Sequence, residues 1–234
     1  MDEVCVMELK QSVLADNDRD AEALREELRR KGTYYINLMS APGSGKTSLL
    51  RKLIPALGGD CRAGVMEADI DSDVDAKTLC AEGIPTIQLH TGGMCHLDAD
   101  MSRQGLRAMR AADLVFLENI GNLVCPAEYD TGAFLKLMIL ALPEGDDKPL
   151  KYPLMFHVVD AVIVNKTDAA AYFDFDFARC EAAIRKVNPH APIFPVSAKT
   201  GEGIPELAAW LLQQYAAWRQ NLAPAVPKEV PAPQ

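Results

Sequence analysis

Histidine, basic charge and long apolar runs are all scarce in this chain. Its 234 residues include only four histidines, and none of them lies in a histidine-rich tract of the kind that stores metal. No apolar run is long enough to span a membrane, and the opening Met1-Asp2-Glu3 does not resemble a signal peptide. We therefore expect a cytoplasmic protein that has no membrane partner.

Basic residues are outnumbered by acidic ones. Lysine and arginine number 24 against 33 aspartates and glutamates, which gives a formal net charge of −9. A nucleic-acid backbone is bound by basic patches, so nucleic acid is not expected as the main partner. Six cysteines spread over this length do not resemble a disulfide framework. They are typical of a reducing cytosol, where thiols stay free to react or to bind metal.

Patterns typical of strands and helices alternate along the chain. Runs of β-branched and apolar residues predict strands at 33–39, 62–68, 85–89, 113–117, 134–142, 161–164 and 193–196. Helical spacing of apolar residues predicts helices between and after them, at 47–57, 78–82, 98–111, 177–187 and 204–222. This alternation is typical of an α/β fold, in which helices cover both faces of a mostly parallel sheet.

We divide the chain into three parts. Residues 1–32 are predicted to be an N-terminal helical segment, which Asp16-Asn17-Asp18 could split into two helices. Residues 33–222 are predicted to form one α/β domain, and the proline-rich residues 223–234 a disordered tail. The N-terminal segment offers only Cys5 as a soft metal ligand, so packing on the domain edge is favoured over metal delivery.

A glycine-rich turn joins the first strand of this domain to its first helix. Backbone N–H groups and the helix dipole converge at such a turn and make it an anion site. Lys46 would reach the β- and γ-phosphates of a nucleotide and assist catalysis, and Thr47 would offer its hydroxyl to Mg²⁺. The predicted phosphate-binding residues are Gly43, Ser44, Gly45, Lys46, Thr47 and Ser48.

One residue departs from the usual pattern of a phosphate-binding loop. Ser40 stands where that pattern begins with glycine. The alternative interpretation is an ordinary glycine-rich turn that carries a surface lysine. The predicted strand before Gly-Ser-Gly-Lys-Thr and the predicted helix after it favour a phosphate-binding loop over this alternative, and so do the motifs downstream.

A base-recognition motif follows a later buried strand. In Asn165-Lys166-Thr167-Asp168, the final carboxylate would accept hydrogen bonds from N1 and the exocyclic amine of guanine. Adenine would leave that carboxylate unpaired, so the discrimination between the two bases is large. Ser197-Ala198-Lys199 is the companion loop, which would supply a backbone N–H to the guanine carbonyl. Together with the phosphate-binding loop, these motifs favour GTP.

Oxygen ligands for Mg²⁺ are expected near the same edge of the sheet. Besides Thr47, the carboxylates most expected to face the ion are Asp69 and Glu118, each at the end of a predicted strand. The segment from Glu118 to Gly121 stands where GTPases carry their γ-phosphate sensor, although a solvated Glu118 is the alternative. Asp75 is a weaker candidate for orienting the attacking water, since helix-start carboxylates are common.

Hydrolysis of GTP is expected to be slow. No arginine finger and no glutamine stands beside residues 118–121. Where GTPases have such groups, these supply about 10³–10⁵ in rate. A partner protein that accelerates the reaction would therefore be consistent with the sequence.

Three further residues suggest a transition-metal site. Cys95 and His96 offer a thiolate and an imidazole at one point, and Cys125 lies on the loop after Glu118. A lone cysteine is most often a small buried hydrophobic residue. Here both loops follow strands at the expected ligand-binding edge of the sheet, which favours a metal site. The other cysteines and histidines are expected to be structural or incidental.

These motifs resemble those of the HypB family, the nickel-incorporation GTPases of [NiFe]-hydrogenase maturation. The similarity rests on residues 37–47, on Thr-Gly-Gly-Met-Cys-His-Leu-Asp-Ala at 91–99 and on Glu-Asn-Ile-Gly-Asn-Leu-Val-Cys-Pro at 118–126. Residues 187–189 and 197–203 extend it, so that it covers roughly residues 33–215. The family accepts serine at the position of Ser40.

The resemblance implies a P-loop GTPase domain that binds metal and forms a homodimer through its nucleotide face in the GTP state. It implies delivery of nickel to a hydrogenase precursor, together with a small partner chaperone. It also implies that Cys95, His96 and Cys125 are ligands of Ni²⁺ or Zn²⁺. Many family members carry an N-terminal Cys-x-x-Cys-Gly-Cys motif or a histidine-rich tract. This chain has only Cys5 there, so an N-terminal nickel store is not expected.

Two other functions remain open at this point. A urease-type maturation GTPase would carry Cys-Pro-His after Thr-Gly-Gly, and this chain has Met94-Cys95-His96 instead. The second alternative is a regulatory nucleotide-binding protein whose cysteines are structural. The metal content of the purified protein would separate this last class from the other two.

Overall fold

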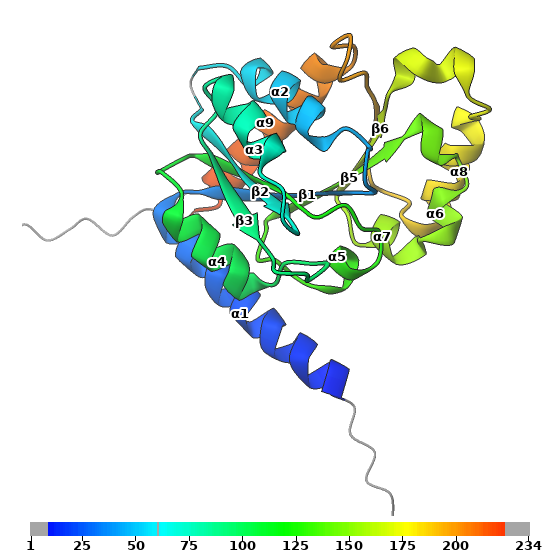
Figure 1. The fold of residues 1–234 in the computed structure, drawn as a ribbon. Helices are drawn as coiled ribbons and strands as arrows, with labels where there is room; N and C mark the ends of the chain where they lie inside the picture. The colour runs from blue at the N-terminus through cyan, green and yellow to red at the C-terminus, as the bar shows by residue number, and fades with distance from the viewer. Residues whose placement is uncertain (1–8, 60, 223–234) are drawn as a thin grey trace, which may run out of the picture.

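A single parallel sheet organises the domain. The computed structural model describes residues 9–59 and 61–222, so Cys5 and the predicted proline-rich tail lie outside the described residues. Within these residues, seven strands are arranged in the order β3-β2-β4-β1-β5-β6-β7, and every neighbouring pair is parallel (Figure 1). The strands are β1 (Tyr34–Ser40), β2 (Ala63–Asp69), β3 (Thr86–His90), β4 (Leu114–Glu118), β5 (Leu135–Ala141), β6 (Ala161–Asn165) and β7 (Ile193–Pro195).

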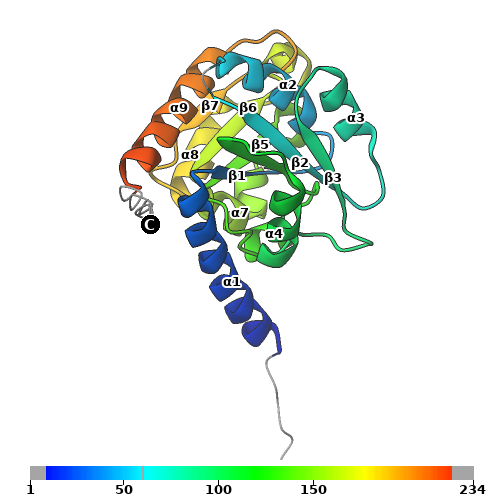
Figure 2. The ribbon, with the colours of Figure 1, turned by 90° about the vertical axis from the view of Figure 1, so that its left-hand side faces the viewer.

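Helices cover both faces of this sheet, which confirms the predicted α/β fold (Figures 1 and 2). One face carries α2 (Lys46–Ala56), α3 (Val74–Ala81) and α9 (Ile204–Gln220). The other carries α1 (Leu9–Lys31), α4 (Ala99–Ala108), α7 (Pro153–His157) and α8 (Phe177–Val187). Short helical turns lie in the loops, at α5 (Cys125–Glu128), η1 (Leu142–Glu144), α6 (Lys148–Lys151) and η2 (Thr167–Tyr172).

The central strand β1 shows how the two cores arise. All of its residues are buried. Ile36 and Leu38 pack in the core beneath α2 and α9, whereas Tyr35 packs with Leu24 and Leu28 of α1. Successive side chains of a strand point to opposite faces, so a strand covered on both sides is apolar throughout. This is why β1 is mostly apolar, although it also buries the polar residues Asn37 and Ser40.

Helix α1 is unbroken, which corrects the expectation that residues 16–18 could split it. Asn17, at the suggested break, is buried and forms hydrogen bonds outside its own helix. An asparagine weakens helices mainly because its side chain competes for the local backbone. Contacts with other elements remove that competition here. The first turns of α1 extend beyond the rest of the domain (Figure 2).

The parallel sheet determines where the functional loops meet. Loops that follow β1, β2, β3, β4 and β6 all leave from the carboxyl edge of the sheet, where ligands of open α/β folds bind. No helix within residues 9–59 and 61–222 is long and apolar enough to cross a membrane.

Candidate nucleotide and metal site

The turn between β1 and α2 has the backbone of a phosphate-binding loop. Gly43 and Gly45 have φ angles of 72° and 93°, which favour glycine. A Cβ atom on Gly45 would lie 2.8 Å from Nδ2 of Asn165, so glycine allows the two loops to approach. Because α2 begins at Lys46, the amides of Lys46, Thr47 and Ser48 lie at a helix N-terminus, where backbone N–H groups lack intrahelical partners. This arrangement suits the phosphates of a nucleotide.

Ser40 takes part in this loop although it departs from the usual glycine. Its buried Oγ donates to the carbonyl of Ala41 at 2.8 Å and accepts from Nζ of Lys46 at 3.2 Å. The carbonyl of Ser40 accepts from the amide of Asn122 at 2.9 Å. Ser40 therefore links Lys46 to the segment that follows β4.

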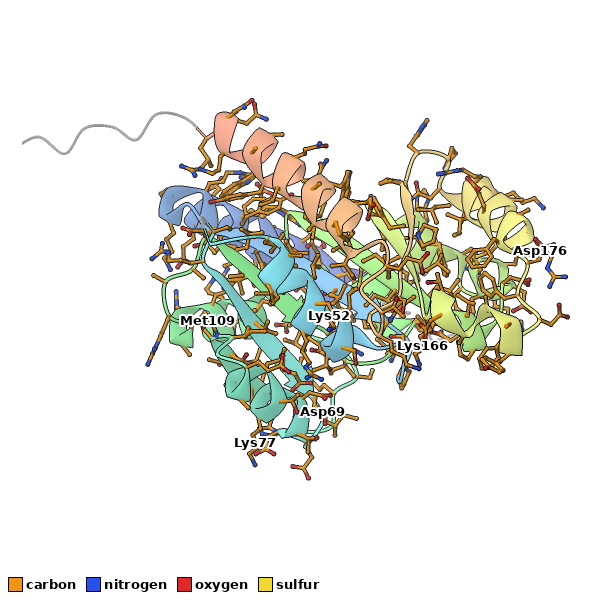
Figure 3. All side chains as sticks on the ribbon, turned by 90° about the horizontal axis from the view of Figure 1, so that it is seen from above. Lys52, Asp69, Lys77, Met109, Lys166 and Asp176 are labelled. Atoms are coloured by element: carbon orange, nitrogen blue, oxygen red, sulfur yellow. The ribbon has the colours of Figure 1, made fainter. Side chains whose placement is uncertain are left out.

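A cavity of about 540 Å³ lies beside the phosphate-binding loop, a volume in the range of small-molecule sites. Figure 3 labels Lys52, from α2, and Lys166, from the loop after β6, which lie on the same side of the molecule. The cavity is lined by residues of α2, α3, the loop after β6 and the loop after β7: Gly45, Ser48, Arg51, Lys52, Glu82, Asn165, Lys166, Asp168, Ala169, Ala198 and Lys199.

The predicted base-recognition residues are hydrogen-bonded to the phosphate-binding loop and to each other. Nδ2 of Asn165 donates to the carbonyl of Ser44 at 2.9 Å, and its Oδ1 accepts from the amide of Ala198 at 3.1 Å. Nζ of Lys166 donates to the carbonyl of Gly43 at 2.6 Å. Lys166 itself has a φ of 66°, in the region that favours glycine, so its contacts hold a strained backbone.

Asp168 is oriented by the companion loop. Its Oδ1 accepts from Oγ of Ser197 at 2.7 Å, and its Oδ2 lies 3.9 Å from Nζ of Lys199. Oγ of Ser197 also accepts from the amide of Thr200 at 3.1 Å, which fixes the loop after β7. The structure thus brings together the residues that the sequence assigned to the phosphates and to the base.

Three carboxylates converge next to Thr47. Glu67 of β2, Asp75 of α3 and Glu118 of β4 have oxygens within 4.8 Å of one another. Glu67 and Glu118 are register partners across β2 and β4 and are only 4% and 2% exposed. Burial raises the pKa of each to about 7. Oγ1 of Thr47 donates to Oε1 of Glu118 at 2.6 Å.

This donor set fits Mg²⁺. Oε2 of Glu67 and Oε2 of Glu118 are buried and have no hydrogen-bond partner in the described part of the chain. Buried charged oxygens require compensation, and Mg²⁺ accepts carboxylate and hydroxyl oxygens as ligands. Thr47, Glu67 and Glu118 are therefore the residues that would hold the ion.

Asp69 lies at the end of β2, as the sequence predicted, but its carboxylate forms hydrogen bonds within its own loop. Its Oδ1 accepts from the amides of Asp71 and Ser72 at 3.0 and 2.8 Å, and these hydrogen bonds lower its pKa. It is not one of the three convergent carboxylates, and Glu67, two residues earlier, takes that place. Sequence reasoning missed Glu67 because it lies inside the β2 run. The available signal was the charge itself, since an acidic residue within a buried strand needs a partner.

The segment predicted to sense the γ-phosphate, residues 118–121, lies against the phosphate-binding loop. The amide of Asn119 donates to the carbonyl of Leu38 at 3.0 Å. A Cβ atom on Gly121 would lie 2.9 Å from Cα of Pro42, so this glycine permits close backbone contact. With the hydrogen bond from Asn122 to Ser40, residues 118–122 follow the phosphate-binding loop closely. A displacement of the phosphate-binding loop would therefore also displace residues 118–122.

The predicted transition-metal residues also come together. Sγ of Cys95 lies 3.0 Å from Sγ of Cys125 and 4.0 Å from Nδ1 of His96. The ring of His96 stacks on Tyr129 with centroids 3.7 Å apart. Burial lowers the pKa of His96, which favours the neutral imidazole that binds metals. Within the described residues, the acidic cluster is the only place where three potential metal ligands lie within 4.8 Å of one another. Cys95 is near both Cys125 and His96, but the three residues therefore do not form such a cluster.

The remaining described cysteines differ from this pair. Cys180 is buried in the core beneath α8, and burial raises its pKa to about 12. Cys61 packs against the opposite core, and burial raises its pKa to about 11. The pKa of Cys125 is also raised, chiefly by its hydrogen bond with Cys95, so it is packing against the core, and not the thiol pKa, that distinguishes Cys61 and Cys180 from the pair. Cys80 is exposed on α3.

The fold and these loops define a P-loop nucleotide-binding domain, and residues 34–195 match the family model described as the CobW/HypB/UreG nucleotide-binding domain. The chain is 44% identical over 214 residues to the hydrogenase maturation factor HypB of Azotobacter chroococcum, which covers 91% of this chain and 70% of that relative. It is 42% identical over 216 residues to the hydrogenase/urease maturation factor HypB of Helicobacter hepaticus, covering 90% and 88%. The chain belongs to the HypB family, as its motifs predicted.

Solved structures agree with this assignment. HypB from Helicobacter pylori in complex with nickel superposes with a TM-score of 0.82 at 37% identity, covering 90% of this chain and 99% of that one. HypB from Archaeoglobus fulgidus gives a TM-score of 0.81 at 37% identity, covering 86% and 100%. The fold and the family expected from the sequence are therefore confirmed.

Proposed function

We propose that this chain is a metal-binding GTPase that delivers nickel during [NiFe]-hydrogenase maturation. The observation that carries the proposal is the Cys95–Cys125 pair, whose sulfur atoms lie 3.0 Å apart, with Cys125 on the segment that continues from residues 118–122 beside the phosphate-binding loop. The names of the curated HypB relatives support hydrogenase maturation, and the nickel complex of the Helicobacter pylori protein supports nickel as the cargo. Thiolate and imidazole ligands suit Zn²⁺ as well as Ni²⁺.

GTP would be bound across the cavity between the two recognition loops. Lys46 would neutralise charge on the β- and γ-phosphates, and Asp168 would select guanine. Bound Mg²⁺ would offset the charge that develops on the phosphates during hydrolysis. Asp75, exposed in the first turn of α3, would orient the attacking water. Asp69 stays a predicted magnesium ligand that no contact in the described residues supports.

A structural change caused by GTP hydrolysis would be transmitted to the metal loops through residues 118–125. The sensor segment touches Pro42 and Ser40 of the phosphate-binding loop and leads directly into Cys125. Nδ2 of Asn122 also approaches the carbonyl of Cys95 at 3.5 Å. Movement of the sensor segment on hydrolysis would therefore change the spacing of the two thiols. This gives a short physical route from GTP hydrolysis to metal release.

A GTP-dependent homodimer is supported by exposed apolar side chains near the same edge. Large apolar residues that face water mark interaction surfaces when they are grouped. Five such residues lie on α6, on α7, at the end of η2 and at the start of α8, and two more stand next to the proposed metal ligands in the sequence. The five are Leu150, Leu154, Tyr172, Phe173 and Phe177, and the two are Met94 and Val124. A small partner chaperone and a hydrogenase precursor would complete the delivery.

A metal titration tests the proposal. We expect the Cys95→Ala, Cys125→Ala double variant to lose Ni²⁺ binding and to keep GTP binding, since neither thiol lines the nucleotide cavity. Cys80→Ala, which removes an exposed thiol far from either ligand in sequence, is the matched control and should bind like the wild type. Titrations with and without a non-hydrolysable GTP analogue measure the coupling.

Two outcomes would overturn it. A double variant that binds stoichiometric metal with wild-type affinity would place the ligands elsewhere, and Cys5 would be the first alternative. A wild-type protein that binds GTP but no Ni²⁺ or Zn²⁺ in either nucleotide state would favour a regulatory nucleotide-binding protein.

A further inference from the structure

We infer that Asn17 of helix α1 is a positioning residue that holds the Cys95–His96 loop and the Cys125 loop in register. The inference rests on the proposed function, because those loops carry the proposed metal ligands. Oδ1 of Asn17 accepts from the amide of Ala99 at 2.9 Å. Nδ2 of Asn17 donates to the carbonyl of Asp130, also at 2.9 Å. One side chain thus connects two loops that lie 31 residues apart in sequence, between Ala99 and Asp130.

These contacts close a ring around the metal loops. Ala99 begins α4 three residues after His96, and Asp130 directly follows Tyr129. His96 and Tyr129 are themselves stacked, with ring planes inclined by 17°. The two loops are therefore joined by the stacked His96 and Tyr129 rings and, separately, by the hydrogen bonds of Asn17. Displacing either loop would break both the ring stacking and one of these hydrogen bonds.

Asparagine is well suited to this place. Its amide offers a donor and an acceptor in different directions, whereas aspartate offers only acceptors and leucine neither. Asn17 is only 8% exposed, so its two partners would have no ready access to water if it were removed. One of those partners, the first amide of α4, would also lack an intrahelical acceptor. A polar residue that is unfavourable for the helix is thus explained by contacts outside the helix.

Other contacts of α1 provide a control that distinguishes an effect on the metal loops from a general loss of helix packing. Arg25 donates through Nη2 to both oxygens of Asp130 at 2.6 Å and so supports the same loop. Arg103 of α4 instead donates to the carbonyl of Asp20 at 2.9 Å. That bond fastens α1 to α4 without touching either metal loop. Arg103→Met is therefore a matched control for loss of an α1–α4 contact.

The first experiment measures how close the two thiols lie, with no metal present. Protein is equilibrated in a glutathione redox buffer, in which oxidised glutathione accepts the two electrons released as Cys95 and Cys125 form a disulfide. Peptide mass mapping then gives the fraction of that disulfide. We expect Asn17→Leu to lower the equilibrium constant for its formation by about tenfold, and Arg103→Met to leave it unchanged.

Asn17→Asp provides a variant of nearly the same size. It keeps an acceptor for Ala99 but places an oxygen against the carbonyl oxygen of Asp130, so it should lower disulfide formation as well. In the same proteins we expect Ni²⁺ affinity to fall by about tenfold. GDP affinity should stay at the wild-type value, because the nucleotide loops are held by Asn165 and Ser40.

Wild-type disulfide formation in both Asn17 variants would overturn the inference, as would an equal loss in Arg103→Met. The disulfide measurement also tests the inference independently of the proposed function. A wild-type protein that forms the disulfide readily and binds no metal would contradict the proposed function. The effect of Asn17 on the two thiols would still be decided by the variants.

Discussion

Replacing Asn165 by alanine should separate the phosphate-binding loop from the base-recognition loops. The side chain is 1% exposed and bridges the carbonyl of Ser44 and the amide of Ala198. It also lies against Gly45, where even a Cβ atom would be too close to its Nδ2. Alanine would therefore leave two backbone groups without a partner and a gap beside the loop.

The magnitude follows from those two groups. A buried donor or acceptor that loses its partner costs about 1–3 kcal/mol, so two of them cost roughly 2–6 kcal/mol before the loops relax. Domains of this kind have free energies of unfolding of about 5–15 kcal/mol, so the variant should still fold. Binding of GDP would have to restore the loop geometry, so we expect its affinity to fall by about 100-fold, or about 2.7 kcal/mol.

Calorimetric titration with GDP and urea unfolding measure the two effects. Asn188→Ala is the matched control, because Asn188 also bridges backbone groups, donating to the carbonyls of Phe156 and Val159 and accepting from the amide of Ala191. It should lower stability by a similar amount and leave GDP affinity unchanged. Wild-type GDP affinity in Asn165→Ala, or an equal loss in Asn188→Ala, would refute the reasoning.

Three further predictions concern the base, the dimer and pH. Asp168→Asn should weaken GTP binding and favour xanthosine triphosphate in competition assays; equal hydrolysis of ATP and GTP by the wild type would contradict the guanine assignment. Phe173→Ser with Leu154→Ser should abolish the dimers that a GTP analogue induces in sedimentation runs, and a wild type that stays monomeric with the analogue at micromolar concentration would contradict the proposed dimer. Burial raises the pKa of Asp130, but the hydrogen bonds from Arg25 and from the amide of Gly132, together with the positive charges of Lys136 and Arg25, more than offset this and hold it below its usual value. The resulting stabilisation should be complete above about pH 4, the pKa of an unfolded aspartate, and be lost as pH falls through the lower folded-state pKa. Urea unfolding of wild type and Asp130→Asn should thus differ by a constant amount from pH 7 to about pH 4 and converge below it; a gap that shrinks already between pH 7 and 5 would show that another group is responsible.

The strands were predictable because each is a local apolar run. The sheet order was not, since it depends on which runs meet in space. The short helices α6 and α7 went unpredicted for a related reason. Segments of four and five residues, each with proline in the first turn, are too short to show helical periodicity. The suggested break in α1 was wrong because the contacts of Asn17 come from residues 99 and 130, which no local pattern includes.

The nucleotide site shows the same division. Residues within the motifs, such as Lys46 and Asp168, could be assigned a role because the motifs depend on local spacing. The proposed magnesium ligands depend instead on which strands are neighbours. β2 pairs with β4 so that Glu67 lies opposite Glu118, a fact that the sequence alone does not contain. The choice of Asp69 followed the rule that site residues lie just beyond a strand, and the structure places a convergent carboxylate within the strand instead.

The proposed transition-metal site would be completed by residues of a second protomer. Cys95, His96 and Cys125 are three proposed ligands, and a closed tetrahedral zinc site needs four. A two-fold axis near Met94 and Val124, both exposed beside the ligands, would bring two such sets together. Ni²⁺ in a square-planar site and Zn²⁺ in a tetrahedral one would then respond differently to the distance between protomers. Residues 118–125 connect the proposed protomer contact near Val124 to the phosphate-binding loop. The bound nucleotide would therefore set the distance between the protomers, and that distance would determine whether Ni²⁺ or Zn²⁺ is held.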